Sequence, residues 1–173
     1  MADSNTLLDM FKEVCKKYQI TDVSDDLGKA FRTFVHLDKD RDGTLDKEEI
    51  KKMDGMSEKM IEILFKTADG GTTDTITLQK LFKFFFLPRI KKNWKTLFDL
   101  VDTDNSGHIT VDEIEPYLAA CGVVGADSED AINIISSYDT DNDQQLSYEE
   151  FSKYLIDDLD KFMDELVSAH TKK

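Results

Sequence analysis

The chain has 173 residues, of which 40% are hydrophobic, and this is enough for one domain with a sizeable core or for two small lobes. Its 36 acidic residues outnumber its 22 basic residues, and the formal net charge of −14 argues against binding to nucleic acid or to anionic membrane surfaces. The same charge favours cations and basic partners, while 11 Phe and 5 Tyr argue against the disorder that strong acidity can indicate.

The N-terminal segment carries no recognisable targeting signal. Its first ten residues lack the basic region and long apolar run of a signal peptide, and Ala2 stands where N-myristoylation requires Gly. The longest apolar run, Phe84–Leu87, is far too short to cross a bilayer. We therefore expect a cytoplasmic monomer with no transmembrane segment and no lipidation signal.

Residues 6–18 predict an amphipathic helix, because apolar side chains recur there at spacings of three and four. These side chains are Leu7, Leu8, Phe11, Val14, Cys15 and Tyr18. Such a helix either docks on the body of the protein or stays free to bind a target.

A second helix is predicted to run to Leu37, with Ser24 able to cap its N-terminus. Its apolar side consists of Leu27, Phe31, Phe34 and Leu37. It leads directly into an acidic stretch, Asp38–Glu49, after which a further helix carries Ile50 and Met53.

The stretch Asp38–Glu49 reads DKDRDGTLDKEE and predicts a calcium-binding loop. Ca²⁺ takes about six to eight oxygen ligands at about 2.3–2.6 Å, and a tight loop with alternating acids can supply them. Gly43 lets the backbone turn with a positive φ. The expected ligands are Asp38, Asp40, Asp42, the Thr44 carbonyl and bidentate Glu49. The alternative is an acidic surface turn, which Asp and Gly also favour.

The corresponding stretch at residues 69–80 reads DGGTTDTITLQK and lacks this pattern. Gly71 and Thr73 occupy its third and fifth positions, and Lys80 would place an ammonium where the first loop has a bidentate Glu. Its flanking helices keep the apolar pattern, so we interpret it as a structural partner of the first loop. A site built from backbone carbonyls is the alternative.

Residues 58–66 and 78–88 predict the two most apolar helices. In the second, apolar side chains cover more than one face, namely Leu81, Phe82, Phe84, Phe85, Phe86 and Leu87. Core packing explains most of this, and a surface buried against a partner or another lobe is the alternative. Pro88 should end or kink the helix and marks a domain boundary.

A third loop, residues 102–113, reads DTDNSGHITVDE and turns at Gly107. Its expected ligands are Asp102, Asp104, the Ser106 hydroxyl, the His108 carbonyl and Glu113. A transition-metal role for the His108 side chain is the alternative, but it has no second His or Cys nearby in the sequence.

A fourth loop, residues 139–150, reads DTDNDQQLSYEE. Its expected ligands are Asp139, Asp141, Asp143, the Gln145 carbonyl and Glu150. Gln144 stands where the other two acidic loops have Gly, and a non-Gly residue in the left-handed conformation costs about 1 kcal/mol. We therefore expect this loop to bind calcium more weakly than an equal loop with Gly.

The last predicted helix runs from about residue 148 towards residue 169. Its apolar stripe consists of Phe151, Leu155, Leu159, Phe162, Met163 and Leu166. The helix is long enough to fold back on its own lobe or to dock on the other one.

The four loops belong to a repeat, with starts at residues 38, 69, 102 and 139. The residues one and four positions before each loop are apolar, and the eighth loop position is aliphatic each time. The chain resembles the EF-hand family in these features and in the match of its first loop to D-x-[DN]-x-[DN]-G-x5-E.

The resemblance implies an all-α fold of four EF-hand helix–loop–helix units in two paired lobes, with an extra N-terminal helix and a long C-terminal helix. It also implies short antiparallel pairing between eighth loop positions, Leu45 with Ile76 and Ile109 with Leu146. The expected domains are an N-terminal helix in residues 1–22, a first pair in residues 23–88 and a second pair in residues 89–173.

The expected function is calcium binding, with three Ca²⁺ ions as cofactors and Mg²⁺ as a competitor. One hypothesis is a sensor similar to calmodulin, which exposes an apolar surface to the helix of a partner protein. The alternatives are a calcium buffer with compact lobes, similar to the sarcoplasmic calcium-binding proteins, or the regulatory subunit of an enzyme, similar to that of calcineurin. We expect no enzymatic activity, because no Ser/His/Asp set, phosphate loop or Cys/His pair at motif spacing stands out.

Overall fold

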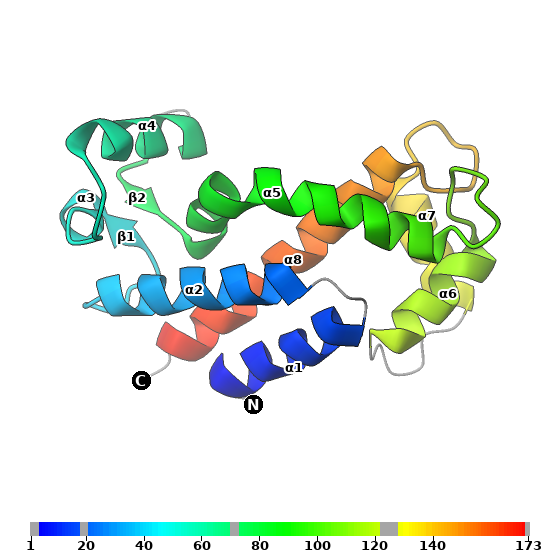
Figure 1. Ribbon diagram of the computed structural model, residues 1–173, viewed down its shortest axis with the longest axis horizontal. Helices are drawn as coiled ribbons and strands as arrows, with labels where there is room; N and C mark the ends of the chain where they lie inside the picture. The colour runs from blue at the N-terminus through cyan, green and yellow to red at the C-terminus, as the bar shows by residue number, and fades with distance from the viewer. Residues whose placement is uncertain (1–3, 18–20, 70–72, 122–127, 172–173) are drawn as a thin grey trace. The chain divides into compact units, whose positions relative to one another are not determined.

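The computed structural model describes residues 4–17, 21–69, 73–121 and 128–171, and these residues form eight α-helices and one two-stranded sheet (Figure 1). The helices are α1 (Ser4–Lys17), α2 (Thr21–Leu37), α3 (Lys47–Ile50), α4 (Glu58–Asp69), α5 (Leu78–Val101), α6 (Val111–Ala120), α7 (Ser128–Tyr138) and α8 (Tyr148–Thr171). The strands are β1 (Leu45–Asp46) and β2 (Thr75–Ile76). Each of the four loops joins two helices, as the repeat predicts.

The loops are joined in pairs by short β contacts. Strands β1 and β2 are antiparallel, with Leu45 opposite Ile76. Ile109 and Leu146 form an isolated antiparallel bridge, with N···O distances of 2.8 and 2.9 Å. All four side chains are completely buried, so each pair of loops shares one small apolar centre. Both predicted pairings are confirmed.

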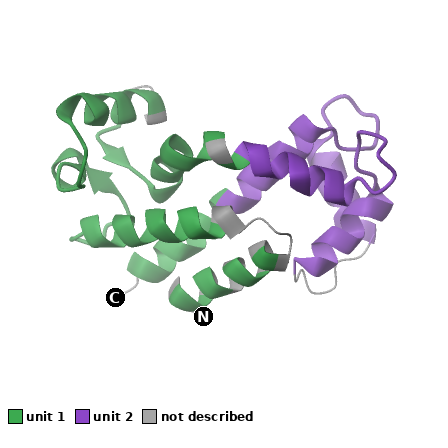
Figure 2. Cartoon of the chain, in the orientation of Figure 1, with its two compact units in different colours: residues 1–90, 160–173 green, residues 91–159 purple. Residues whose placement is uncertain are grey.

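The chain is divided into two compact units (Figure 2). Unit 1 comprises residues 1–90 and 160–173 and holds the first two loops. Unit 2 comprises residues 91–159 and holds the third and fourth loops. The second half of α8 therefore belongs to unit 1, and the boundaries proposed at residues 22 and 88 stay predictions.

Each unit has its own core. In unit 1, Phe34, Leu64 and Phe82 are completely buried. In unit 2, the ring centroid of Phe151 lies 5.9 Å from that of Phe98 and 5.7 Å from that of Tyr117. Edge-on aromatic contacts of this kind add to the free energy of burial. The apolar residues that precede the loops thus form the cores that fix the ends of the helices.

Three helix boundaries differ from the prediction. Helix α2 begins at Thr21, so Ser24 lies inside the helix, 4% exposed, and does not cap it. Helix α3 ends at Ile50, so Met53 lies beyond it. Helix α5 continues through Pro88 to Val101, because burial of Ile90, Trp94 and Leu97 offsets the hydrogen bond that Pro88 cannot make.

Helix α1 and the second half of α8 pack within unit 1. Helix α1 lies against α2, and Leu8 is buried there, so the N-terminal helix is docked. The second half of α8 is joined to α5, since Lys83 pairs with Asp160 and the Gln79 amide donates to Asp164. No helix in the described part of the chain has the length and apolar character needed to cross a membrane.

Candidate calcium sites

Each acidic loop begins while the preceding helix is still forming its hydrogen bonds. The backbone N–H groups of Asp38, Asp102 and Asp139 each donate to the carbonyl four residues earlier, at 2.8 Å. The first acid of each loop is therefore held rigidly at the end of a helix. Asp38 and Asp102 are also buried, at 2% and 4% exposed.

The two oxygens of this first carboxylate have different partners in all three loops. Oδ1 accepts the N–H of the fifth loop residue, at 3.2 Å from Asp42 to Asp38, 3.0 Å from Ser106 to Asp102 and 3.2 Å from Asp143 to Asp139. Oδ2 accepts the N–H of the sixth residue, at 3.1 Å from Gly43, 2.9 Å from Gly107 and 2.9 Å from Gln144. The sixth residues have φ values of 85°, 86° and 66°, so Gln144 adopts the turn that Gly makes elsewhere.

The last carboxylate of each loop joins the two ends of the loop. One oxygen accepts the N–H of the second residue, at 3.0 Å for Glu49, 2.8 Å for Glu113 and 2.6 Å for Glu150. The other accepts the N–H of the ninth residue, at 3.2, 3.0 and 2.9 Å in the same order. Both oxygens are thereby oriented, as a bidentate ligand requires.

These hydrogen bonds lower the pKa of the closing glutamates in the third and fourth loops. Burial by itself would raise the pKa of Glu150, but donors from Thr140 and Ser147 outweigh it and lower the pKa to about 2. Burial would also raise the pKa of Glu113, but hydrogen bonds donated by Thr110 and Thr103 outweigh burial and lower this pKa. Both side chains therefore carry their negative charge at neutral pH.

The carboxylates converge in three groups whose oxygens lie within 4.8 Å of one another. The groups are Asp38, Asp40 and Glu49; Asp102, Asp104 and Glu113; and Asp139, Asp141 and Glu150. Two oxygens on one Ca²⁺ ion are at most about 5 Å apart, twice the Ca–O distance, so each group fits a single ion. The donors are all oxygen, which suits a hard cation such as Ca²⁺ rather than Zn²⁺ or Cu²⁺.

The structure places the other predicted ligands in the same loops but outside these groups. Asp42 Oδ1 accepts the Thr44 N–H at 2.7 Å, and Asp143 Oδ1 accepts the Gln145 N–H at 2.9 Å. The Ser106 hydroxyl donates to the His108 carbonyl at 3.0 Å. Coordination by Asp42, Thr44, Ser106, His108, Asp143 and Gln145 stays a prediction.

Only part of the second loop is described. The Asp69 side chain and residues 70–72, including Gly71, lie outside the described residues. In the described part, Lys80 Nζ lies 3.4 Å from the Thr73 hydroxyl, and Ile76 pairs with the first loop. A role as scaffold for the first loop accords with this pairing, and the prediction that it binds no ion stays untested.

One contact at the first loop has no counterpart in the sequence pattern. His170, near the end of α8, places Nε2 3.2 Å from Asp38 Oδ2. Val167 and Thr171 lie against Gly43 in the same loop. The apolar stripe of the last helix indicates that it packs somewhere, but only the fold shows that it ends on this loop.

Comparisons with known proteins agree with this geometry. A family model for an EF-hand domain pair matches residues 91–156, and a model for a single EF-hand matches residues 31–54. Calcium-dependent protein kinase 21 of Arabidopsis thaliana is 30% identical over 154 residues, which are 83% of this chain and 28% of the kinase. Calcium-dependent protein kinase 2 of Zea mays is 35% identical over 127 residues, 68% of this chain and 24% of the kinase.

The 16 kDa calcium-binding protein of Schistosoma mansoni is 28% identical over 129 residues, 70% of this chain and 90% of that protein. The chain thus spans about a quarter of the kinases it matches and most of this small protein. The matched models, the paired loops and the three oxygen-lined groups support one conclusion. The chain belongs to the EF-hand calcium-binding proteins.

Proposed function

We propose that this protein binds three Ca²⁺ ions and acts as a calcium sensor that offers an apolar groove to a helix of a partner protein. The proposed ligands are Asp38, Asp40, Asp42, Thr44 and Glu49 in the first loop; Asp102, Asp104, Ser106, His108 and Glu113 in the third; and Asp139, Asp141, Asp143, Gln145 and Glu150 in the fourth. Thr44, His108 and Gln145 would contribute backbone carbonyls.

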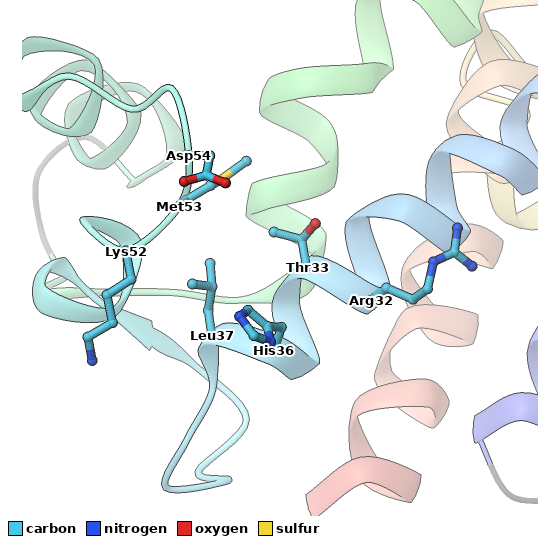
Figure 3. Close-up of a pocket in the computed structure, with 7 residues that line it drawn as sticks. All are labelled: Arg32, Thr33, His36, Leu37, Lys52, Met53 and Asp54. Atoms are coloured by element: carbon cyan, nitrogen blue, oxygen red, sulfur yellow. The ribbon is translucent and has the colours of Figure 1, made fainter.

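The observation that carries the sensor role is a groove in unit 1, formed by two pockets that share Thr33 and Met53. One pocket, about 390 Å³, lies between α2 and the segment after α3 and is lined by Arg32, Thr33, His36, Leu37, Lys52, Met53 and Asp54 (Figure 3). The other, about 180 Å³, is lined by Lys29, Ala30, Thr33, Met53, Leu81, Phe85 and Phe86. We call the two together the α2–α5 groove.

The side chains of this groove suit an amphipathic helix. Met53, Phe85 and Phe86 are half-buried, so apolar surface is already accessible between the elements. Met adapts its shape to different partners, and sensor EF-hands use such residues to bind helices. A partner helix with an apolar stripe would bury these three side chains further.

The charge around the groove favours a partner with acidic residues beside its apolar stripe. Lys29, Arg32 and Lys52 contribute cations to the lining, against the single acid Asp54. Figure 3 shows Arg32 and Lys52 at the two ends of the first pocket, with Leu37 and His36 between them. Acids also lie nearby, since Asp26 is 3.9 Å from Lys29 and Asp38 directly follows Leu37, so the excess of cations belongs to the lining alone. This departs from the basic partner that net charge alone predicts.

The decisive experiment is a Ca²⁺ titration followed by binding of a hydrophobic dye, with and without millimolar Mg²⁺. We expect dye fluorescence to rise with Ca²⁺ and not with Mg²⁺, and Met53→Gln to reduce the rise. Ile132→Gln is the matched control, because Ile132 is an apolar residue of unit 2 that is 49% exposed and lies outside the groove. Loops that take up Mg²⁺, with no dye response to Ca²⁺, would rule out the sensor.

Substitution of the closing residue tests the three sites separately. Glu49→Gln, Glu113→Gln and Glu150→Gln should each remove about one bound ion, because an amide cannot replace a bidentate carboxylate. Lys80→Gln should remove none. Calorimetric stoichiometry gives the count, and a value that stays at three in all of the glutamate variants would refute the ligand assignment.

A calcium buffer is the second candidate, and the packing of α8 favours it. The last turn of α8 lies on the first loop, and Met163 and Leu166 are completely buried. A compact unit of this kind could bind calcium without exposing new surface. The dye experiment separates the two candidates, since a buffer takes up calcium with no change in dye fluorescence.

A further inference from the structure

The end of α8 is built into the first calcium loop. His170 is 9% exposed at its side chain and lies 3.2 Å, Nε2 to Oδ2, from the fully buried carboxylate of Asp38. One turn of helix around it, Val167 and Thr171 pack so closely on Gly43 that a Cβ there would lie 3.1 Å and 3.2 Å from their methyl groups. All of these residues belong to unit 1.

His170 faces the oxygen of Asp38 that accepts the N–H of Gly43. In each acidic loop, Oδ2 of the first Asp accepts the N–H of the sixth residue, whereas Oδ1 accepts the N–H of the fifth residue. The group of converging oxygens at the first loop consists of Asp38, Asp40 and Glu49 and does not include His170. The imidazole is therefore placed as a neighbour of a ligand and not as a ligand, in keeping with the preference of Ca²⁺ for oxygen.

The third and fourth loops have no equivalent contact among the described residues. There, the hydrogen bonds to Oδ2 of Asp102 and Asp139 come from the backbone of the loop itself, from Gly107 and Gln144. Around Gly107, nothing lies within 4 Å of where a Cβ would be. The first loop thus differs from the others by a second layer of contacts from α8.

His170 Nε2 is buried and makes no hydrogen bond of good geometry in the structure, although Asp38 Oδ2 lies within hydrogen-bond distance. In the tautomer with a proton on Nε2, rotation of the ring would aim this N–H at the oxygen. A buried donor left without an acceptor is unfavourable, so any state that brings the two groups into line is stabilised.

We propose that His170 is a positioning residue of the first calcium site. Its Nε2–H donates to Asp38 Oδ2, holds Oδ1 towards the ion and so couples docking of the last turn of α8 to calcium binding in the first loop. The inference rests on the proposed binding of Ca²⁺ by Asp38, and coupling of two events acts in both directions. The docked helix end strengthens calcium binding, and calcium strengthens docking of the helix end.

The test uses the full chain with Glu113→Gln and Glu150→Gln, which leaves the first loop as the calcium site. In this background His170→Ala should weaken Ca²⁺ binding about three- to tenfold in calorimetry, the size expected for one hydrogen bond to an outer-shell partner. His170→Gln should restore affinity to within about twofold, because its amide N–H can reach the position of Nε2. Ser168→Ala, an exposed change in the same turn, is the control and should alter nothing.

Hydrogen exchange of the backbone amides of residues 166–171 gives a second readout. Exchange there should slow when Ca²⁺ is added, and this slowing should be lost in His170→Ala and kept in His170→Gln. If His170 contributed only to helix packing, His170→Gln would not restore the slowing of exchange.

The possible results separate this inference from the proposed function. If the chain with Glu113→Gln and Glu150→Gln binds no Ca²⁺, the assignment of the first loop as a calcium site is wrong, and the inference about His170 is wrong as well. If it binds one ion, and either His170→Ala matches the parent or Gln fails to restore binding, the inference alone is wrong. Should His170→Ala fail to fold, equal exchange with and without Ca²⁺ in the parent would overturn the coupling.

Discussion

At the scale of single residues, the sixth loop position shows that a residue other than Gly can adopt the left-handed turn. Gln144 has a φ of 66°, close to the 85° of Gly43 and the 86° of Gly107. Its N–H still reaches Asp139 Oδ2 at 2.9 Å. The fourth loop therefore keeps the turn and its hydrogen bond. The cost is about 1 kcal/mol of backbone strain, because Cβ lies close to the following carbonyl oxygen in the left-handed conformation.

This strain predicts that Gln144→Gly stabilises unit 2. The gain in unfolding free energy should be at most about 0.5 kcal/mol, because relief of about 1 kcal/mol of strain exceeds the entropic cost of Gly, about 0.5–1 kcal/mol, only modestly. Urea unfolding followed by the fluorescence of the buried Trp94 in α5 measures it. Gln145→Gly, one position later in the loop, should instead destabilise, and a loss of stability in both variants would contradict the strain argument.

A pH dependence follows from the hydrogen bonds of Glu150. Its pKa is lowered from 4.5 to about 2, so the folded state favours the ionised form. The stability gained this way is fully present above about pH 4.5 and is lost as the pH falls towards 2.

In chelator, wild type should therefore exceed Glu150→Gln in unfolding free energy by about 1–2 kcal/mol at neutral pH. The difference should shrink to nothing near pH 2, where the wild-type carboxyl becomes protonated and resembles the amide. Denaturant titrations along a pH series measure it, with the exposed neighbour Glu149→Gln as the control. A difference that does not change with pH would contradict the role of the hydrogen bonds.

At the scale of elements, periodicity and spacing predicted the architecture. Apolar residues before each loop and at its eighth position gave the four helix–loop–helix units, and the resemblance to EF-hands implied both β contacts. The motif put Glu49, Glu113 and Glu150 at the last loop position, and the structure adds the hydrogen bonds by which they join the loop ends.

The boundaries and the long-range contacts could not be predicted in the same way. Helix α5 passes through Pro88 because buried residues beyond it hold the helix, and this is a property of the fold rather than of the dipeptide. His170 lies 132 positions from Asp38, and no local signal links a histidine at the end of a helix to a loop so far away. The stripe on α8 indicated packing without indicating where.

Substitution of two glycines with almost equal φ distinguishes the cost of backbone strain in the loop from the cost of overpacking against α8. Gly43→Ala and Gly107→Ala both place a Cβ on a left-handed residue, but only the first meets the methyl groups of Val167 and Thr171. We expect Gly43→Ala to cost about 1–2 kcal/mol more than Gly107→Ala, the usual penalty of overpacking. Hydrogen exchange of the core amides of Phe34 in unit 1 and Phe98 in unit 2 measures each loss separately. Equal losses would mean that α8 does not rest on the first loop.

At the scale of the whole molecule, net charge and local charge give different information. The formal charge of −14 is concentrated in part in the acidic loops, and three Ca²⁺ ions would change it to −14 + 6 = −8. Yet the α2–α5 groove is lined by Lys29, Arg32 and Lys52. Total charge therefore predicts affinity for cations, whereas the choice of the proposed partner would depend on the charges that line the groove.

The last prediction concerns self-repulsion. Because the calcium-free chain carries 36 acids against 22 bases, its melting temperature in chelator should rise by several degrees as KCl increases from about 10 to 200 mM, where the Debye length falls from about 30 to 7 Å. With Ca²⁺ at a hundredfold excess over Kd, each filled site should add about 2.7 kcal/mol. The salt dependence should then flatten, because the ions have neutralised the most crowded acids. Scanning calorimetry in chelator and in Ca²⁺ at both salt concentrations tests this, and a calcium-free melting temperature indifferent to KCl would show that acid crowding does not limit stability.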